Sequence, residues 1–234
     1  MPPPKQPRRL LLAGATGLVG RAVLQCLAEQ AQAGHSRGPV VALLRRPADA
    51  ALSAALAHAR GEALVHPRLS GAMALPPTDD VLIALGTTIA VAGSPDAFRA
   101  VDFDAVVAVA RAARAAGAER IAVVSALGAD SRSSVFYNRV KGEMEAAVTA
   151  VGFPSLVIGR PSLLAGNRAA LGQPVRTGEQ WALRLMRPIQ GLIPPSVRPI
   201  EARLVARALL GALDEGAPGV LVLPSAEMAR RGAG

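Results

Sequence analysis

Tyr137 and Lys141 lie four residues apart in the sequence, and Ser125 precedes the tyrosine by twelve residues. On a helix, this spacing places the tyrosine and the lysine on one face. A tyrosine hydroxyl can donate a proton to a carbonyl oxygen or remove one from an alcohol. A phenol titrates near pH 10 in water, so a neighbouring ammonium is needed to favour the phenolate. Lys141 would supply that charge, and Ser125 would hydrogen-bond the substrate oxygen.

The same spacing has a purely structural interpretation. An amphipathic helix often carries a half-buried tyrosine and a lysine whose ammonium reaches water, and this explains most Y-x-x-x-K matches. Tyr137 is the only tyrosine in the chain, so no second candidate competes with it. Which interpretation applies therefore depends on whether the rest of the chain predicts a site beside these side chains.

The segment 10–20 predicts a strand, a glycine turn and the start of a helix. Leu10 to Ala13 form a short apolar run, followed by glycines at three-residue spacing. Gly14 suits a tight turn, Gly17 lets the backbone approach a pyrophosphate, and Gly20 lets the helix pack closely on the strand. The first N–H groups of that helix favour an anion. We therefore expect Gly14, Thr16, Gly17, Leu18 and Gly20 to bind a dinucleotide, although glycine turns without a ligand are also common.

Arg45 and Arg46 follow the predicted strand 39–44, and no acidic residue lies between Val40 and Ala48. In dinucleotide-binding folds, this position meets the adenosine ribose, where an acidic side chain binds the 2′-hydroxyl of NAD and arginine accommodates the 2′-phosphate of NADP. A guanidinium suits phosphate because its planar donors engage two oxygens. The pair predicts NADP(H) as the cofactor, and the alternative is a solvated loop pair.

Two further strand ends are expected to face the cofactor. Asp79 to Gly86 read as a strand that ends in Gly86-Thr87-Thr88, and Leu85, Gly86 and Thr87 are predicted to contact the cofactor. Ser125 follows the apolar strand 121–124. Ligands bind along the carboxyl ends of parallel strands, which is why we place both segments in the site.

Alternating apolar strands and helical patterns predict an α/β fold with a doubly wound parallel sheet of the Rossmann type. Residues 1–7 are expected to form a flexible tail, and 8–234 a single domain with a small cap on the substrate side, mainly from 160–200. The pocket is then either open or completed by a second subunit in a homodimer. The expected helices are 18–32, 48–60, 96–116, 137–151, 179–186 and 201–214, and the expected strands are 10–13, 39–44, 63–66, 79–86, 121–124, 154–159 and 219–223.

Composition narrows the functional classes. The 234 residues are 51% hydrophobic and 18% charged, which excludes a disordered chain, and no apolar run is long enough to span a membrane. The net charge of +9 comes from scattered arginines rather than a patch, so nucleic-acid binding is not favoured. Cys26 is expected to be a buried structural thiol, and the three histidines lack metal-ligand spacing. Without a secretion signal, we expect a cytoplasmic protein.

Taken together, the glycine motif, Ser125 and Tyr137-x-x-x-Lys141 resemble the short-chain dehydrogenase/reductase superfamily. The finer pattern is similar to an atypical branch that contains the Tat-interacting oxidoreductase-like proteins and bacterial NAD(P)-binding relatives. This resemblance covers most of residues 8–225. It rests on the following stretches: Leu85 to Thr88, Phe98 to Asp102, Ser125 to Asp130, Lys141 to Glu145 and Arg160 to Leu164.

The resemblance implies an NADP(H)-dependent oxidoreductase acting on a carbonyl or alcohol substrate. Tyr137 would be the acid/base, Ser125 its partner, and Lys141 would hold the nicotinamide ribose, while Arg160 is expected to contact the cofactor. One departure is Asp102, which stands where many members of the superfamily have an asparagine, so that it either relays protons or caps or orients a loop. Because the branch includes regulators, a cofactor-sensing protein that acts through a protein partner is the alternative.

Overall fold

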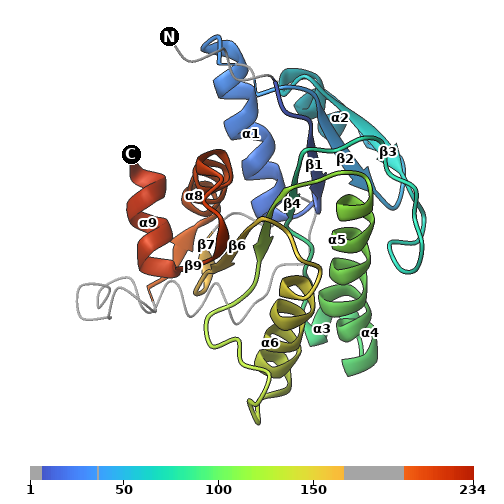
Figure 1. The fold of residues 1–234 in the computed structure, drawn as a ribbon, viewed down its shortest axis with the longest axis vertical. Coiled ribbons are helices and arrows are strands. Elements are labelled where there is room, and N and C mark those ends of the chain that lie inside the picture. Colours follow the sequence, from blue (N-terminus) through green and yellow to red (C-terminus); the bar gives the residue numbers. More distant parts are fainter. Residues whose placement is uncertain (1–6, 36, 166–197) are drawn as a thin grey trace.

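Seven parallel strands form the central sheet in the order β3-β2-β1-β4-β5-β6-β9 (Figure 1). The computed structural model describes residues 7–35, 37–165 and 198–234. The order reverses between β1 and β4, where doubly wound sheets bind dinucleotides. This arrangement confirms the predicted fold class. The strands are β1 Leu10–Ala13, β2 Val40–Leu44, β3 Gly61–Val65, β4 Asp80–Ile83, β5 Arg120–Val124, β6 Ser155–Arg160 and β9 Gly219–Pro224.

Helices cover both faces of this sheet, because successive apolar side chains along each strand point to opposite faces. Leu10 and Leu12 of β1 pack in one hydrophobic cluster, whereas Leu11 and Ala13 pack in the other. On the first face lie α1 Leu18–Gln32, α2 Ala50–His58, α8 Ala202–Glu215 and α9 Ser225–Ala233, and on the second lie α5 Val106–Ala115 and α6 Phe136–Thr149.

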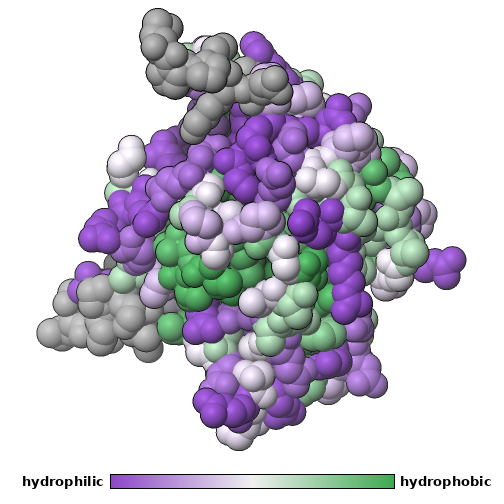
Figure 2. All heavy atoms as spheres, in the orientation of Figure 1, coloured by the Kyte–Doolittle hydropathy of each residue, from purple (hydrophilic) through white to green (hydrophobic). Residues whose placement is uncertain are grey.

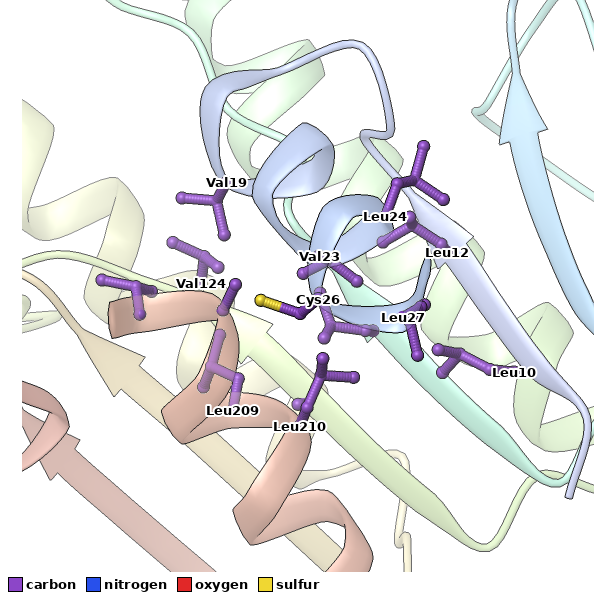
Figure 3. Close-up of a cluster of buried hydrophobic side chains, with 14 of the residues drawn as sticks. Leu10, Leu12, Val19, Val23, Leu24, Cys26, Leu27, Val124, Leu209 and Leu210 are labelled. Atoms are coloured by element: carbon purple, nitrogen blue, oxygen red, sulfur yellow. The ribbon is translucent and has the colours of Figure 1, made fainter. Parts of the chain in front are cut away.

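The first cluster lies between α1, α8 and the strands β1 and β5 (Figure 3). Cys26 belongs to it with 3% of its surface exposed, and its thiol points into the space between α1 and α8. Burial raises the pKa of the Cys26 thiol above its ordinary value, which keeps it protonated and unreactive. The prediction of a buried structural thiol is confirmed.

The long helix predicted over 96–116 is interrupted, and this is a correction. Ser94 caps α4, Pro95–Arg99, by accepting a hydrogen bond from the N–H of Ala97, as the sequence suggested. A π-helical turn, Ala100–Ala105, then separates α4 from α5. A π-turn adds one residue to the helical repeat and rotates the following side chains, and such turns often lie at functional sites. Here it contains Asp102, whose side chain is fully buried.

The C-terminal strands and helices complete the main sheet. β9 pairs with β6, as the pattern of Gly219 to Leu223 suggested, and forms an edge with Val220 and Val222 exposed. Figure 2 shows a hydrophobic patch near the centre of the view, with mostly hydrophilic surface above it where α1 lies. Two short strands, β7 Leu164–Ala165 and β8 Ile200–Glu201, pair in parallel. Most of the predicted cap, including the helix 179–186, lies outside the described residues, so the domain division stays a prediction.

Besides the π-turn, four elements of the described residues were not predicted: the short strands β7 and β8, the helix α9 and the single turn α3, Ile89–Ala92. Within residues 7–35, 37–165 and 198–234, no helix is long and apolar enough to cross a membrane. The same residues contain no group of three or more histidine, cysteine, aspartate or glutamate side chains arranged to hold a metal ion.

Candidate active site

A cavity of about 230 Å³ opens at the carboxyl edge of the sheet, where β1, β4, β5 and β6 end. It is lined by residues from loops that are far apart in the sequence. Parallel strands bring these loops together because all of them leave the sheet at the same edge. The predicted site residues that line the cavity are Gly17, Leu18, Leu85, Gly86, Thr87, Ser125, Tyr137 and Lys141.

The glycines between β1 and α1 form a tight cradle next to this cavity. Gly14 has a φ of +95°, and a Cβ there would lie 2.5 Å from the carbonyl oxygen of Ala84. A Cβ on Gly20 would collide with the carbonyl oxygen of Gly14. Both positions therefore require glycine, which brings the helix close to β1 and β4. Gly14 and Gly20 lie behind the cavity wall rather than in it.

The start of α1 suits a pyrophosphate. Gly17 is its N-cap, and no side chain among the described residues caps the helix there. The first-turn N–H groups therefore remain available to an anion, which the helix dipole also favours. Gly17 and Leu18 line the cavity, so this helix terminus opens directly into it.

Tyr137 and Lys141 occupy the first two turns of α6 and face the cavity. The Tyr137 ring is half-buried and packs on the fully buried ring of Phe98, with centroids 5.3 Å apart. This contact restrains the ring of Tyr137, a residue that also lines the cavity. Lys141 is only 3% exposed, so its ammonium needs partners within the protein.

Asp102 is the partner of Lys141. Its Oδ1 lies 2.7 Å from the lysine Nζ, and its Oδ2 accepts a hydrogen bond of 2.8 Å from the N–H of Thr87. The carboxylate thus orients the Gly86–Thr87 loop and neutralises the ammonium. Of the alternatives for Asp102, this contact supports the orientation of a loop. Asp102 Oδ1 makes no hydrogen bond of good geometry with a described residue, although it faces the ammonium.

Ser125 belongs to a second buried network that sequence reasoning missed. Its hydroxyl donates a 2.5 Å hydrogen bond to Oε1 of Glu145, and Arg160 binds both oxygens of the same carboxylate. These hydrogen bonds raise the pKa of Arg160 above its ordinary value. The helical spacing could have pointed to Glu145, because this residue lies one turn after Lys141 and two turns after Tyr137 and therefore on the same face of the helix.

The remaining predicted residues lie outside the cavity lining. Arg160 is held by Glu145 behind Ser125, so the structure does not place its guanidinium in the cavity. Arg45 and Arg46 are exposed directly after β2, and neither forms a hydrogen bond or ion pair with another described residue. Thr16 is exposed in the glycine turn. Cofactor contacts by these four residues stay predictions.

A parallel sheet in this order, with a glycine cradle between β1 and α1, defines a nucleotide-binding α/β protein of the Rossmann type. The family described as NAD(P)H-binding matches residues 14–152. The chain therefore belongs to the NAD(P)H-binding family, and this match covers the cradle, Asp102, Ser125 and α6.

Relatives over nearly the whole chain are proteins called FMP52, mitochondrial. The one from Aspergillus fumigatus is 36% identical over 219 residues, covering 88% of this chain and 89% of the relative. The one from Lodderomyces elongisporus is 31% identical over 217 residues, covering 90% and 88%. Because these relatives are named as mitochondrial, the expectation of a cytoplasmic location is contradicted. It rested on the lack of a secretion signal, which does not test for import into an organelle.

Solved structures show the same fold at low sequence identity. MoeE5 in complex with UDP-glucuronic acid and NAD superposes with a TM-score of 0.67 at 19% identity, covering 92% of this chain and 75% of MoeE5. A putative NAD-dependent epimerase/dehydratase from Bacillus halodurans gives a TM-score of 0.60 at 17% identity, covering 95% and 99%. These likenesses support the NAD(P)-binding fold and do not distinguish NADP from NAD.

Proposed function

We propose that this protein is an NADP(H)-dependent oxidoreductase of the atypical short-chain type, related to the Tat-interacting oxidoreductase-like branch. Its substrate would be a small carbonyl compound or alcohol. The observation that carries this proposal is that Ser125, Tyr137 and Lys141 line the same cavity as the N-terminus of α1. A proton donor and a dinucleotide site thus share one space.

The residues at the cavity fit the cofactor. The Gly14 and Gly20 cradle and the free N-terminus of α1 would hold the pyrophosphate, and Arg45 and Arg46 the 2′-phosphate. Lys141 would bind the nicotinamide ribose through its ammonium. When bound, the nicotinamide supplies or accepts the hydride.

Tyr137 would move the proton. In the reducing direction, its hydroxyl donates a proton to the carbonyl oxygen while the carbonyl carbon receives the hydride, and the product is an alcohol. In the oxidising direction, the phenolate accepts the alcohol proton. The Ser125 hydroxyl already donates its hydrogen bond to Glu145. Its lone pairs therefore remain to accept a hydrogen bond from the substrate hydroxyl or from Tyr137.

The test is NADPH consumption with a panel of ketones, aldehydes and quinones. A general acid contributes about 100-fold or more to the rate. We therefore expect Tyr137→Phe to lose at least that factor in kcat while it still binds NADPH. Turnover that persists undiminished in Tyr137→Phe would remove the tyrosine from the mechanism.

A non-catalytic NADP(H) sensor is the second candidate, and one observation favours it. Lys141 and Ser125, two of the three groups expected to act, are already engaged by the carboxylates of Asp102 and Glu145. Such a protein would bind NADPH tightly without turnover on any substrate of the panel, and it would present a surface to a protein partner. Titration of NADPH beside the activity panel distinguishes the two functions.

A further inference from the structure

Arg21 lies on the first turns of α1, immediately after Gly20, and takes no part in the site described above. Its backbone N–H bonds to the carbonyl oxygen of Gly17. Helical side chains lean toward the N-terminus of their helix, so the Arg21 side chain leaves α1 on the side of the pyrophosphate cradle. It is therefore a positive charge at the phosphate-binding end of α1.

The guanidinium reaches across to the connection that follows β2. Its Nη2 lies 3.8 Å from Oδ2 of Asp49, and Asp49 is the N-cap of α2, where Oδ1 accepts a 2.7 Å hydrogen bond from the N–H of Leu52. Asp49 ends the short connection that begins with Arg45 and Arg46. The adenosine half of a dinucleotide passes between the start of α1 and this connection in Rossmann folds.

Arg21 is incompletely partnered for a group this far from solvent. Its side chain is 23% exposed, and its Nε is buried without a hydrogen-bond partner among the described residues. An unmet buried donor costs free energy, so an additional acceptor at this place would be stabilising. The 3.8 Å contact with Asp49, whose side chain is 68% exposed, is too long for a hydrogen bond.

We propose that Arg21 is a third arginine of the 2′-phosphate site and that Asp49 is its internal counter-ion, which the phosphate displaces. The inference rests on the proposed function and assigns a specificity role to two residues outside the cavity. A phosphate monoester carries up to two negative charges and three acceptor oxygens, which match the partly exposed guanidinium of Arg21 and the two exposed guanidinium groups after β2.

Asp49 then acts against Arg21 and favours NADH over NADPH. Its carboxylate repels a 2′-phosphate, whereas it can accept a hydrogen bond from the 2′-hydroxyl of NADH. The balance between Arg21 and Asp49 therefore determines the preference for NADPH. Asparagine is as good an N-cap as aspartate, so Asp49→Asn removes the charge and retains the cap of α2.

The experiment is a calorimetric titration of the full chain with NADPH and with NADH, which gives the two dissociation constants for the wild type and for two variants. Arg21→Gln should raise the dissociation constant of NADPH about tenfold or more, the effect of a lost charge-assisted hydrogen bond, and leave that of NADH unchanged. Asp49→Asn should lower the dissociation constant of NADPH by a few-fold relative to that of NADH.

Two control variants match these changes elsewhere. Arg203→Gln removes an arginine of α8 that pairs with Glu29 at 2.7 Å, and Asp96→Asn removes an exposed carboxylate of α4. Neither should alter the ratio of the two dissociation constants. Thermal unfolding verifies that each variant is folded.

The outcomes separate the two proposals. A wild type that binds neither nucleotide, or prefers NADH, contradicts the proposed function. A wild type that prefers NADPH, with an unaltered preference in both Arg21→Gln and Asp49→Asn, overturns only the role of Arg21. An equal loss of NADPH and NADH in Arg21→Gln also overturns it, because the arginine would then support the pyrophosphate cradle.

Discussion

Each edge of the sheet has a buried aspartate beside it, and the aspartate at the carboxyl edge lines the cavity described above. At the amino edge, Asp80 is fully buried and binds Arg120 through both oxygens at 2.7 Å, while Arg8 donates to Oδ1 at 3.1 Å. At the carboxyl edge, Asp102 is equally buried, and among the residues that the structure describes Lys141 is its one charged partner.

The two aspartates differ in how many hydrogen bonds the protein donates to each carboxylate. The guanidiniums of Arg8 and Arg120 together engage both oxygens of Asp80. Asp102 Oδ1 has no hydrogen bond of good geometry with a described residue, and both members of its ion pair line the cavity. A saturated charge network stabilises a fold, whereas an unsaturated one beside a cavity is available for binding.

The largest effect on folding is expected for Asp80→Ala. It leaves two arginines without their acceptor, and breaking a buried ion pair in this way should lower the free energy of unfolding by about 3 kcal/mol. Denaturant unfolding measures this loss. The pair of Arg203 and Glu29, in which both side chains are 40% exposed, provides the control, because Glu29→Ala should cost less than about 1 kcal/mol. Equal losses in the two variants would contradict the special status of Asp80. The NADPH affinity of folded Asp80→Ala should equal that of the wild type.

Asp102→Asn should have a smaller effect on stability and a clear one on binding. The amide oxygen can still accept from Thr87, and water in the cavity can hydrate the freed ammonium, so we expect a loss of about 1 kcal/mol. An uncompensated Lys141 should bind an anionic dinucleotide a few-fold more tightly. Titration with NADPH tests this. A large loss of stability with unchanged affinity would make Asp102 the equivalent of Asp80.

The smallest effect concerns Cys26 at alkaline pH. Burial, the main cause, raises the pKa of its thiol above the ordinary 9.0, so below that pH the thiol is protonated in both the folded and the unfolded chain. As the pH rises above 9.0, the unfolded chain releases the proton first, and stability falls by at most about 1.4 kcal/mol per pH unit. Cys26→Ala should reduce this slope in unfolding measurements between neutral and alkaline pH. An unchanged slope would assign it to other groups.

Local patterns were sufficient for most of the elements. The helix predicted over 18–32 has those bounds in α1, since glycine spacing and apolar periodicity act within a few residues. The cap at Ser94 was likewise readable. The interruption of the long helix 96–116 could not be predicted from local patterns. The π-turn contains Asp102, whose contacts are with Lys141 and Thr87 of other elements.

The sequence by itself determined the parallel sheet, the glycine turn and the two-turn face of α6 that carries Tyr137 and Lys141, because these depend on short-range spacing. Only the tertiary structure decided which charges meet. Asp102 with Lys141, Glu145 with Ser125 and Arg160, and Arg21 with Asp49 come from different elements. The sheet brings them together at one edge, where burial makes each pairing matter.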